Sequence, residues 1–163
     1  MLLDTLLEVR RRSEALIAGL EPEDLGLQGM ADASPPKWHL AHTTWFFDTF
    51  VLQPHLASHT PCDVRWSYQF NSYYEAVGER HPRSERGVLS RPTIREILEW
   101  RAYVDAGLTQ VLANEPTSEL RTLVELGLQH EQQHQELLLM DLLDGFSRQP
   151  LEPKYSSEAD LKT

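Results

Sequence analysis

The stretch LGLQHEQQHQELLLMDLL, residues 126–143, contains two histidines four positions apart within an apolar helical pattern. At about 3.6 residues per turn, His130 and His134 lie on the same face of such a helix. That face also carries mostly apolar residues and one carboxylate, namely Leu123, Gly127, Leu137, Leu138 and Asp141. This is the composition of a helix side that faces a protein core. The pattern therefore predicts a core helix with two imidazoles pointing inward.

A second helical pattern, SPPKWHLAHTTWFF at residues 34–47, supplies a third imidazole. His42 shares its face with Trp38, Trp45, Phe46 and Thr49, and Ser34 with Pro35 is typical of a helix start. An unpaired buried polar group costs roughly 1–3 kcal/mol, and a shared metal ion would remove that cost for all three rings. We therefore predict that His42, His130 and His134 bind one transition-metal ion.

A single inward histidine is more often a hydrogen-bonded core residue than a metal ligand, so the assignment depends on the pair at positions i and i+4. Metal-bound histidines usually donate their second N–H to a carboxylate or a carbonyl, and we expect Glu131 or Asp141 to accept it. The remaining histidines are expected to be structural or solvated. His39 is turned about 60° from His42 on the helix, and His55, His59 and His81 lie in proline-rich or polar connections.

The composition predicts a single domain over residues 1–163, because 40% apolar residues in a chain of this length can form one sizeable core. The formal charge of −10 argues against a nucleic-acid partner, and no apolar run is long enough to span a membrane. Cys62 is the only cysteine, and no targeting segment is recognisable, so a cytoplasmic location is expected.

The periodicity predicts an all-α fold with four long helices. They are expected at residues 2 to about 20, at about 35–52, from Pro92 in the first turn to about 114, and at about 117–145, where Gly145 ends the last helix. Four such helices indicate a bundle. The long connection between the second and third helices, about residues 53–91, is expected to help form the site.

Three segments together resemble a known family: SPPKWHLAHTTWFFDTFVL, FNSYYEAVGERHPRSERGVLSRPT and LGLQHEQQHQELLLMDLL. They are similar to the N-terminal, DinB-like domain of the ergothioneine-type sulfoxide synthases, with the related ovothiol synthases close behind. The resemblance covers most of residues 34–146 and implies a DinB-like four-helix bundle. It also implies non-haem Fe(II), held by the residues that match the family ligands, His42, His130 and His134.

The resemblance further implies a reaction, in which O2 and Fe(II) join a cysteine-derived thiol to the imidazole of trimethylhistidine. Three neutral imidazoles leave coordination positions open for such chemistry, although nickel, zinc or copper could replace iron on isolation. Arg83 and Arg86 are candidates to bind the carboxylates of cysteine or gamma-glutamylcysteine, with solvated surface arginines as the alternative. Tyr74 is a further candidate for the substrate pocket, whereas Arg91 is expected to be structural.

The synthases of this family continue into a second domain that resembles formylglycine-generating enzyme, and this chain carries no match to it. The expectation is therefore little turnover by the chain alone, with a separately encoded second domain or a homodimer completing it. Two alternatives stay open: a DinB-like metal-dependent thiol transferase, and a non-catalytic metal-binding or dimerisation module. The motif HEQQH also fits a zinc protease with Glu131 as base, but the downstream pattern of such proteases does not follow.

Overall fold

The computed structural model describes residues 2–72 and 78–155, and within these ranges the secondary structure is helical, with no strand. The prediction of an all-α fold is confirmed. The four long helices are α1 (Leu2–Ala15), α2 (Pro36–Phe46), α5 (Ile94–Val111) and α6 (Ser118–Ser147). Helix α2 continues through a π-helical segment, η2 (Phe47–Leu52), into α3 (Gln53–His55). The described residues also form three further short helices, namely η1 (Asp24–Gly26), α4 (Val64–Phe70) and η4 (Arg83–Val88).

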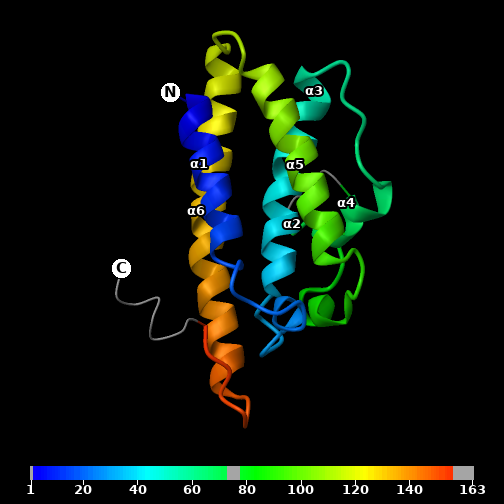
Figure 1. Ribbon diagram of the computed structural model, residues 1–163. Helices are drawn as coiled ribbons and strands as arrows, with labels where there is room; N and C mark the ends of the chain where they lie inside the picture. Colours follow the sequence, from blue (N-terminus) through cyan, green and yellow to red (C-terminus); the bar gives the residue numbers. More distant parts are fainter. Residues whose placement is uncertain (1, 73–77, 156–163) are drawn as a thin grey trace, which may run out of the picture.

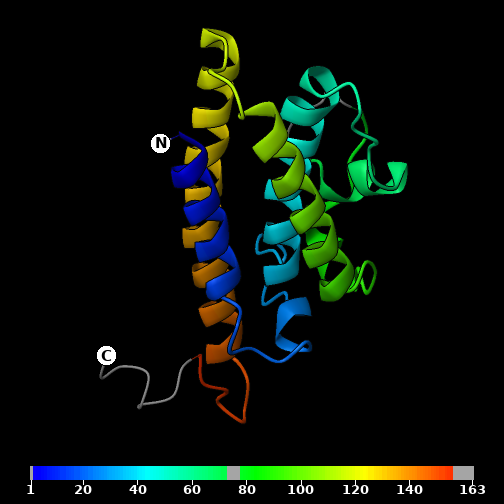
Figure 2. The ribbon, with the colours of Figure 1, turned by 45° about the horizontal axis from the view of Figure 1, so that its top comes forward.

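The helices pair as α1 with α6 and as α2 with α5, and α2 also lies against α6 (Figure 1). Helices α1 and α6 run in one direction, and α2 and α5 run in the opposite direction (Figures 1 and 2). Because α2 and α5 are parallel, the chain between them must return along the length of the bundle. This topology explains the long connection, which contains α4 and η4.

Some helix boundaries differ from the expected ones. Helix α1 ends at Ala15 instead of near residue 20. Helix α5 begins after Thr93, whose side chain forms a capping box with Glu96, so Pro92 lies just outside the helix. Helix α6 continues two residues past Gly145, which is buried against Leu27.

Close contact between α2 and α6 depends on Gly127. A Cβ atom at this position would lie 2.6 Å from the ring of Phe47 and 2.8 Å from that of Phe46. Both rings are buried, so they have little room to move. The glycine therefore lets the helix that carries His130 approach the helix that carries His42.

A buried ionic cluster ties α1, α5 and α6 together. Arg10 and Arg101, both fully buried, form ion pairs with the buried carboxylate of Glu131, which also accepts a hydrogen bond from Ser13 at 2.7 Å. Arg10 additionally pairs with Asp105. Because two guanidinium groups flank the carboxylate, this charge is compensated on the side of α6 that faces α1 and α5. No helix in the described part of the chain is both long and apolar enough to cross a membrane.

Candidate metal centre

Three imidazoles meet where α2 faces α6. Nitrogen atoms of His42, His130 and His134, one from each ring, lie within 4.8 Å of one another. The Nε2 atoms of His42 and His130 are 3.1 Å apart. Two imidazoles on one ion, each about 2.0–2.1 Å from it, would have their nitrogens about 3.0–3.4 Å apart. The spacing of His42 and His130 therefore suits one metal ion, and His134, the third ring that the sequence singled out, lies in the same cluster.

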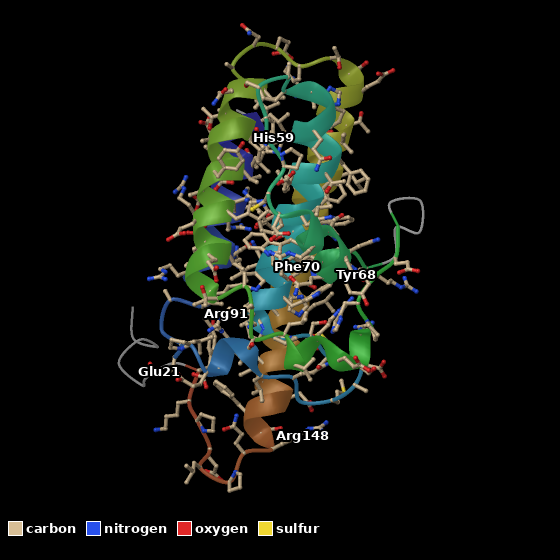
Figure 3. The ribbon with its side chains drawn as sticks, turned by 90° about the vertical axis from the view of Figure 1, so that its right-hand side faces the viewer. Glu21, His59, Tyr68, Phe70, Arg91 and Arg148 are labelled. Atoms are coloured by element: carbon tan, nitrogen blue, oxygen red, sulfur yellow. The ribbon has the colours of Figure 1, made fainter. Side chains whose placement is uncertain are left out.

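His42 is held in place by the connection between α2 and α5. Its Nδ1–H donates to the carbonyl oxygen of Phe70, the last residue of α4, at 2.6 Å. Phe70 lies near the middle of the bundle's length (Figure 3). The ring also stacks on Trp38, with centroids 4.7 Å apart, and on Trp45, at 5.7 Å, one helical turn to either side. These contacts leave Nε2 of His42 as the atom with a free lone pair.

The surroundings keep the imidazoles neutral. Burial lowers the pKa of His42 well below its usual value, and the neighbouring His130 lowers it further. Burial lowers the pKa of His130 to about 4, and it also lowers the pKa of His134 and of His39. Neutral rings are the form in which histidine binds a metal.

The tautomer of His42 directs a nitrogen lone pair into the centre of the cluster. A backbone carbonyl can only accept, so His42 must carry its hydrogen on Nδ1 and turn a lone pair toward Nε2 of His130. If His130 donates from Nε2, its Nδ1 becomes an acceptor, and this buried atom has no hydrogen-bond partner in the described structure. A cation between the rings would be bound by the Nε2 lone pairs of both His42 and His130, while Nδ1 of His130 would carry the hydrogen and still have no partner among the described contacts. The donor set therefore fits a divalent transition metal.

The histidines open onto a pocket of about 420 Å³. Two of the residues lining it are Arg83 and Arg86, which belong to η4 in the connection between α2 and α5. The guanidinium of Arg86 is buried, lies 3.4 Å from the centroid of the Trp38 ring, and donates to the hydroxyls of Ser34 and Ser72 at 2.9 and 3.3 Å. Arg83 is exposed. The pocket thus combines neutral nitrogen donors with positive charge on one wall.

The structure places both predicted substrate arginines at this pocket. Tyr74, the third candidate, lies outside the described residues. Arg91 is not one of the residues that line this pocket, and its side chain donates to the carbonyl of Ser90.

The expected role of Glu131 beside the ligands is wrong. Its carboxylate is bound by Arg10, Arg101 and Ser13 and makes no hydrogen bond to a histidine among the described contacts. The reason is rotation along the helix: residue 131 is turned about 100° from residue 130, toward α1 and α5. The same geometry removes Glu131 from the position of a general base in the HEQQH motif.

Asp141, the other expected carboxylate, contacts the cluster indirectly. Its partner is His39, which the sequence analysis did not expect to take part in the site. Oδ2 of Asp141 accepts from Nε2 of His39, 3.1 Å away, and from the backbone N–H of Ser34, 2.8 Å away. His39 lies outside the group of possible metal ligands, as expected, but it is 3% exposed and its Nδ1 is 2.9 Å from Nδ1 of His134. The sequence does contain an indication of this contact, because Asp141 lies on the same helix face as His134.

The other histidines lie apart from the pocket. His55 is exposed, His59 is bonded to Asp48, and His81 contacts the carbonyl of Glu85. His59 lies toward the end of the bundle opposite to Arg148 (Figure 3).

Comparison with protein families agrees with the helical fold and with the histidine cluster. The model of the DinB superfamily matches residues 5–138, which include most of α1, all of α2 and α5, and the part of α6 that carries both histidines. The chain belongs to the DinB superfamily. A search of curated proteins found no significant match to this DinB chain. The family match thus supports the helical bundle and a possible metal site, and it does not specify a reaction.

Proposed function

We propose that this DinB protein binds Fe(II) through His42, His130 and His134 and provides the metal domain of a sulfoxide synthase. The observation that supports the proposal most strongly is that the three clustered imidazoles line the same pocket as two arginines, Arg83 and Arg86. The resemblance of three sequence segments to the ergothioneine-type synthases supplies the reaction class. A cytoplasmic location is proposed with it.

The proposed reaction joins a thiol and an imidazole with O2 as the oxidant. The sulfur of cysteine or gamma-glutamylcysteine forms a bond to a ring carbon of trimethylhistidine. Each substrate loses one hydrogen, one oxygen atom becomes the sulfoxide oxygen, and the other leaves as water. Bound at the three imidazoles, iron would supply Lewis acidity toward the thiol and the redox capacity that a reaction with O2 requires.

The protein's own groups contribute charge and position. Three neutral ligands do not compensate the charge of a divalent ion, which favours an anionic thiolate in the pocket. We assign the pairing with the carboxylate of the thiol substrate to Arg83, and its exposed position on the pocket wall supports this assignment. Arg86, buried on Trp38, lines the same pocket as His42 and His134 and contributes a fixed positive charge there.

Thiol binding is the step to test first, because it needs only groups that the structure describes. The Fe(II) form is titrated anaerobically with cysteine and with gamma-glutamylcysteine while the metal spectrum is followed. We expect a saturable spectral change in wild type and weaker thiol affinity in Arg83→Met. The matched control is Arg148→Met, because Arg148 lies at the end of the bundle and pairs with Asp144. No thiol-dependent change in wild type would contradict the proposal and favour a binding or dimerisation module.

The second arm adds O2 and trimethylhistidine, with and without candidate second domains, and detects the sulfoxide by mass spectrometry. We expect product, and we propose that a second domain or a second copy of the chain increases it by completing the pocket. Thiol transfer to an electrophile without O2 consumption would instead identify a DinB-type thiol transferase. Zinc-loaded protein serves as the control, because zinc has no redox chemistry and should give no sulfoxide.

A further inference from the structure

A chain of hydrogen bonds ends on one of the three clustered imidazoles. It runs from the backbone N–H of Ser34 to Oδ2 of Asp141 (2.8 Å), from there to Nε2 of His39 (3.1 Å), and from Nδ1 of His39 to Nδ1 of His134 (2.9 Å). His39 and Asp141 are 3% and 9% exposed, so water has little access to these contacts. These hydrogen bonds link α2 to α6 along the wall of the pocket, which Ser34, His39 and His134 help to line.

The direction of each hydrogen bond follows from the groups involved. An ionised carboxylate can only accept, and Asp141 already accepts from Ser34, so Nε2 of His39 is the donor. A neutral imidazole has one N–H, which leaves a lone pair on Nδ1 of His39. Two nitrogens 2.9 Å apart need one hydrogen between them, and it must therefore come from Nδ1 of His134. The remaining nitrogen of His134, Nε2, is then the one with a free lone pair.

We propose that His39 is a positioning residue of the metal centre: oriented by Asp141, it holds His134 in the Nδ1–H tautomer, so that His134 binds the metal through Nε2. The negative charge of Asp141 reaches His134 through the two hydrogen bonds and makes its Nε2 a stronger donor. The inference uses only the geometry of the cluster. It holds whichever substrates the metal serves, so it stands or falls separately from the proposed reaction.

The three imidazoles thus differ in how their second ring nitrogen is held. His42 is fixed by the backbone carbonyl of Phe70, and His134 is fixed by His39 with its carboxylate. Nδ1 of His130 has no partner among the described contacts. His39, which is not itself one of the three proposed ligands, therefore decides the orientation of one of them.

The tautomers can be read directly in the wild-type protein. Long-range nitrogen–proton NMR spectra of protein labelled with ¹⁵N in histidine distinguish an N–H nitrogen from one with a lone pair in each ring. Without metal we expect Nε2–H for His39 and Nδ1–H for His134. With zinc, the nitrogen shifted by metal binding should be Nε2 of His134, and His39 should keep its signals. An Nε2–H tautomer of His134, or a metal shift on His39, would overturn the proposal.

Substitution gives a second, independent measurement. His39→Leu fills the buried position with an apolar side chain of moderate size and removes the acceptor for His134. Loss of such a supporting residue is expected to weaken zinc affinity about 10- to 100-fold. The matched control is His59→Leu, since His59 also bonds a buried aspartate, with Nε2 3.0 Å from Oδ1 of Asp48, but does not line the pocket.

Both variants are compared as folded apoproteins, with the thermal midpoint and the circular dichroism spectrum as checks. We expect His59→Leu to bind zinc as wild type does, even if its melting temperature falls. Equal zinc affinity in His39→Leu and wild type would contradict a positioning role. Equal losses in both variants would assign the effect to general destabilisation and would contradict it as well. If His39→Leu does not fold, the NMR measurement on wild type still decides.

Discussion

The Nδ1–H of His42 donates to the carbonyl oxygen of Phe70 at 2.6 Å, which connects α2 to the C-terminal end of α4. Trp38 makes a parallel contact, since its indole N–H donates to the carbonyl of Gln69 at 3.0 Å. Helix α4 belongs to the connection that runs back along the bundle. This connection therefore orients a candidate metal ligand, and it also supplies Arg83 and Arg86 to the pocket.

Replacement of any one of the three clustered histidines should abolish stable metal binding. We expect one metal ion per chain in wild type and a large loss in His134→Ala, measured by elemental analysis after equilibration with zinc. His55→Ala is the control, because His55 is exposed and lies outside the cluster. Free zinc at about 100 times the dissociation constant should stabilise wild type by roughly 2.7 kcal/mol. Equal metal content in wild type and His134→Ala, or a melting temperature indifferent to chelator, would refute the site.

Addition of one methyl group at Gly127 should damage the metal centre from a distance. In Gly127→Ala the new Cβ would lie 2.6 Å from the ring of Phe47, so α6 must move away from α2. Overpacking of this kind costs roughly 1–3 kcal/mol. We also expect weaker zinc binding, because His130 and His134 move with α6. In Gly19→Ala the added atom meets nothing within 4 Å, so unchanged stability and zinc affinity are expected there.

Removal of the negative charge of Glu131 should destabilise the fold. Glu131→Gln leaves Arg10 and Arg101 buried without their shared carboxylate, and breaking a buried pair in this way costs roughly 3–5 kcal/mol. Urea unfolding measures the loss. The control is Glu136→Gln on the same helix, because Glu136 is exposed and its substitution should change stability by less than about 0.5 kcal/mol. Similar unfolding midpoints for the two variants would mean that the cluster contributes little.

Acid should destabilise the metal-free protein before it titrates most carboxylates. Burial lowers the folded-state pKa of His42, His130 and His134 below the unfolded value of about 6.5. The unfolded chain therefore takes up protons first as the pH falls. Their contribution to stability is fully present above pH 6.5 and declines toward the folded pKa, which is about 4 for His130. Denaturant midpoints of chelator-treated protein should fall from pH 7 to pH 5, and a constant midpoint over that range would contradict neutral, buried imidazoles.

The sequence by itself determined the helical fold and the residues that face inward, because both follow from a period of about 3.6 residues within single segments. The spacing of His130 and His134 places them on one face whatever surrounds them. The face of His42 follows in the same way from Trp38 and Trp45, and all three of these residues are at least 98% buried.

Only the tertiary structure decided which groups share that interior. Both Glu131 and His39 are sequence neighbours of ligand candidates and are turned away from them on the helix, yet Glu131 pairs with arginines of α1 and α5 while His39 contacts His134. A helical period gives the direction of a side chain but not the helix that covers it. That depends on how α1, α2, α5 and α6 pack, and on a connection whose path along the bundle is set by contacts far apart in the sequence.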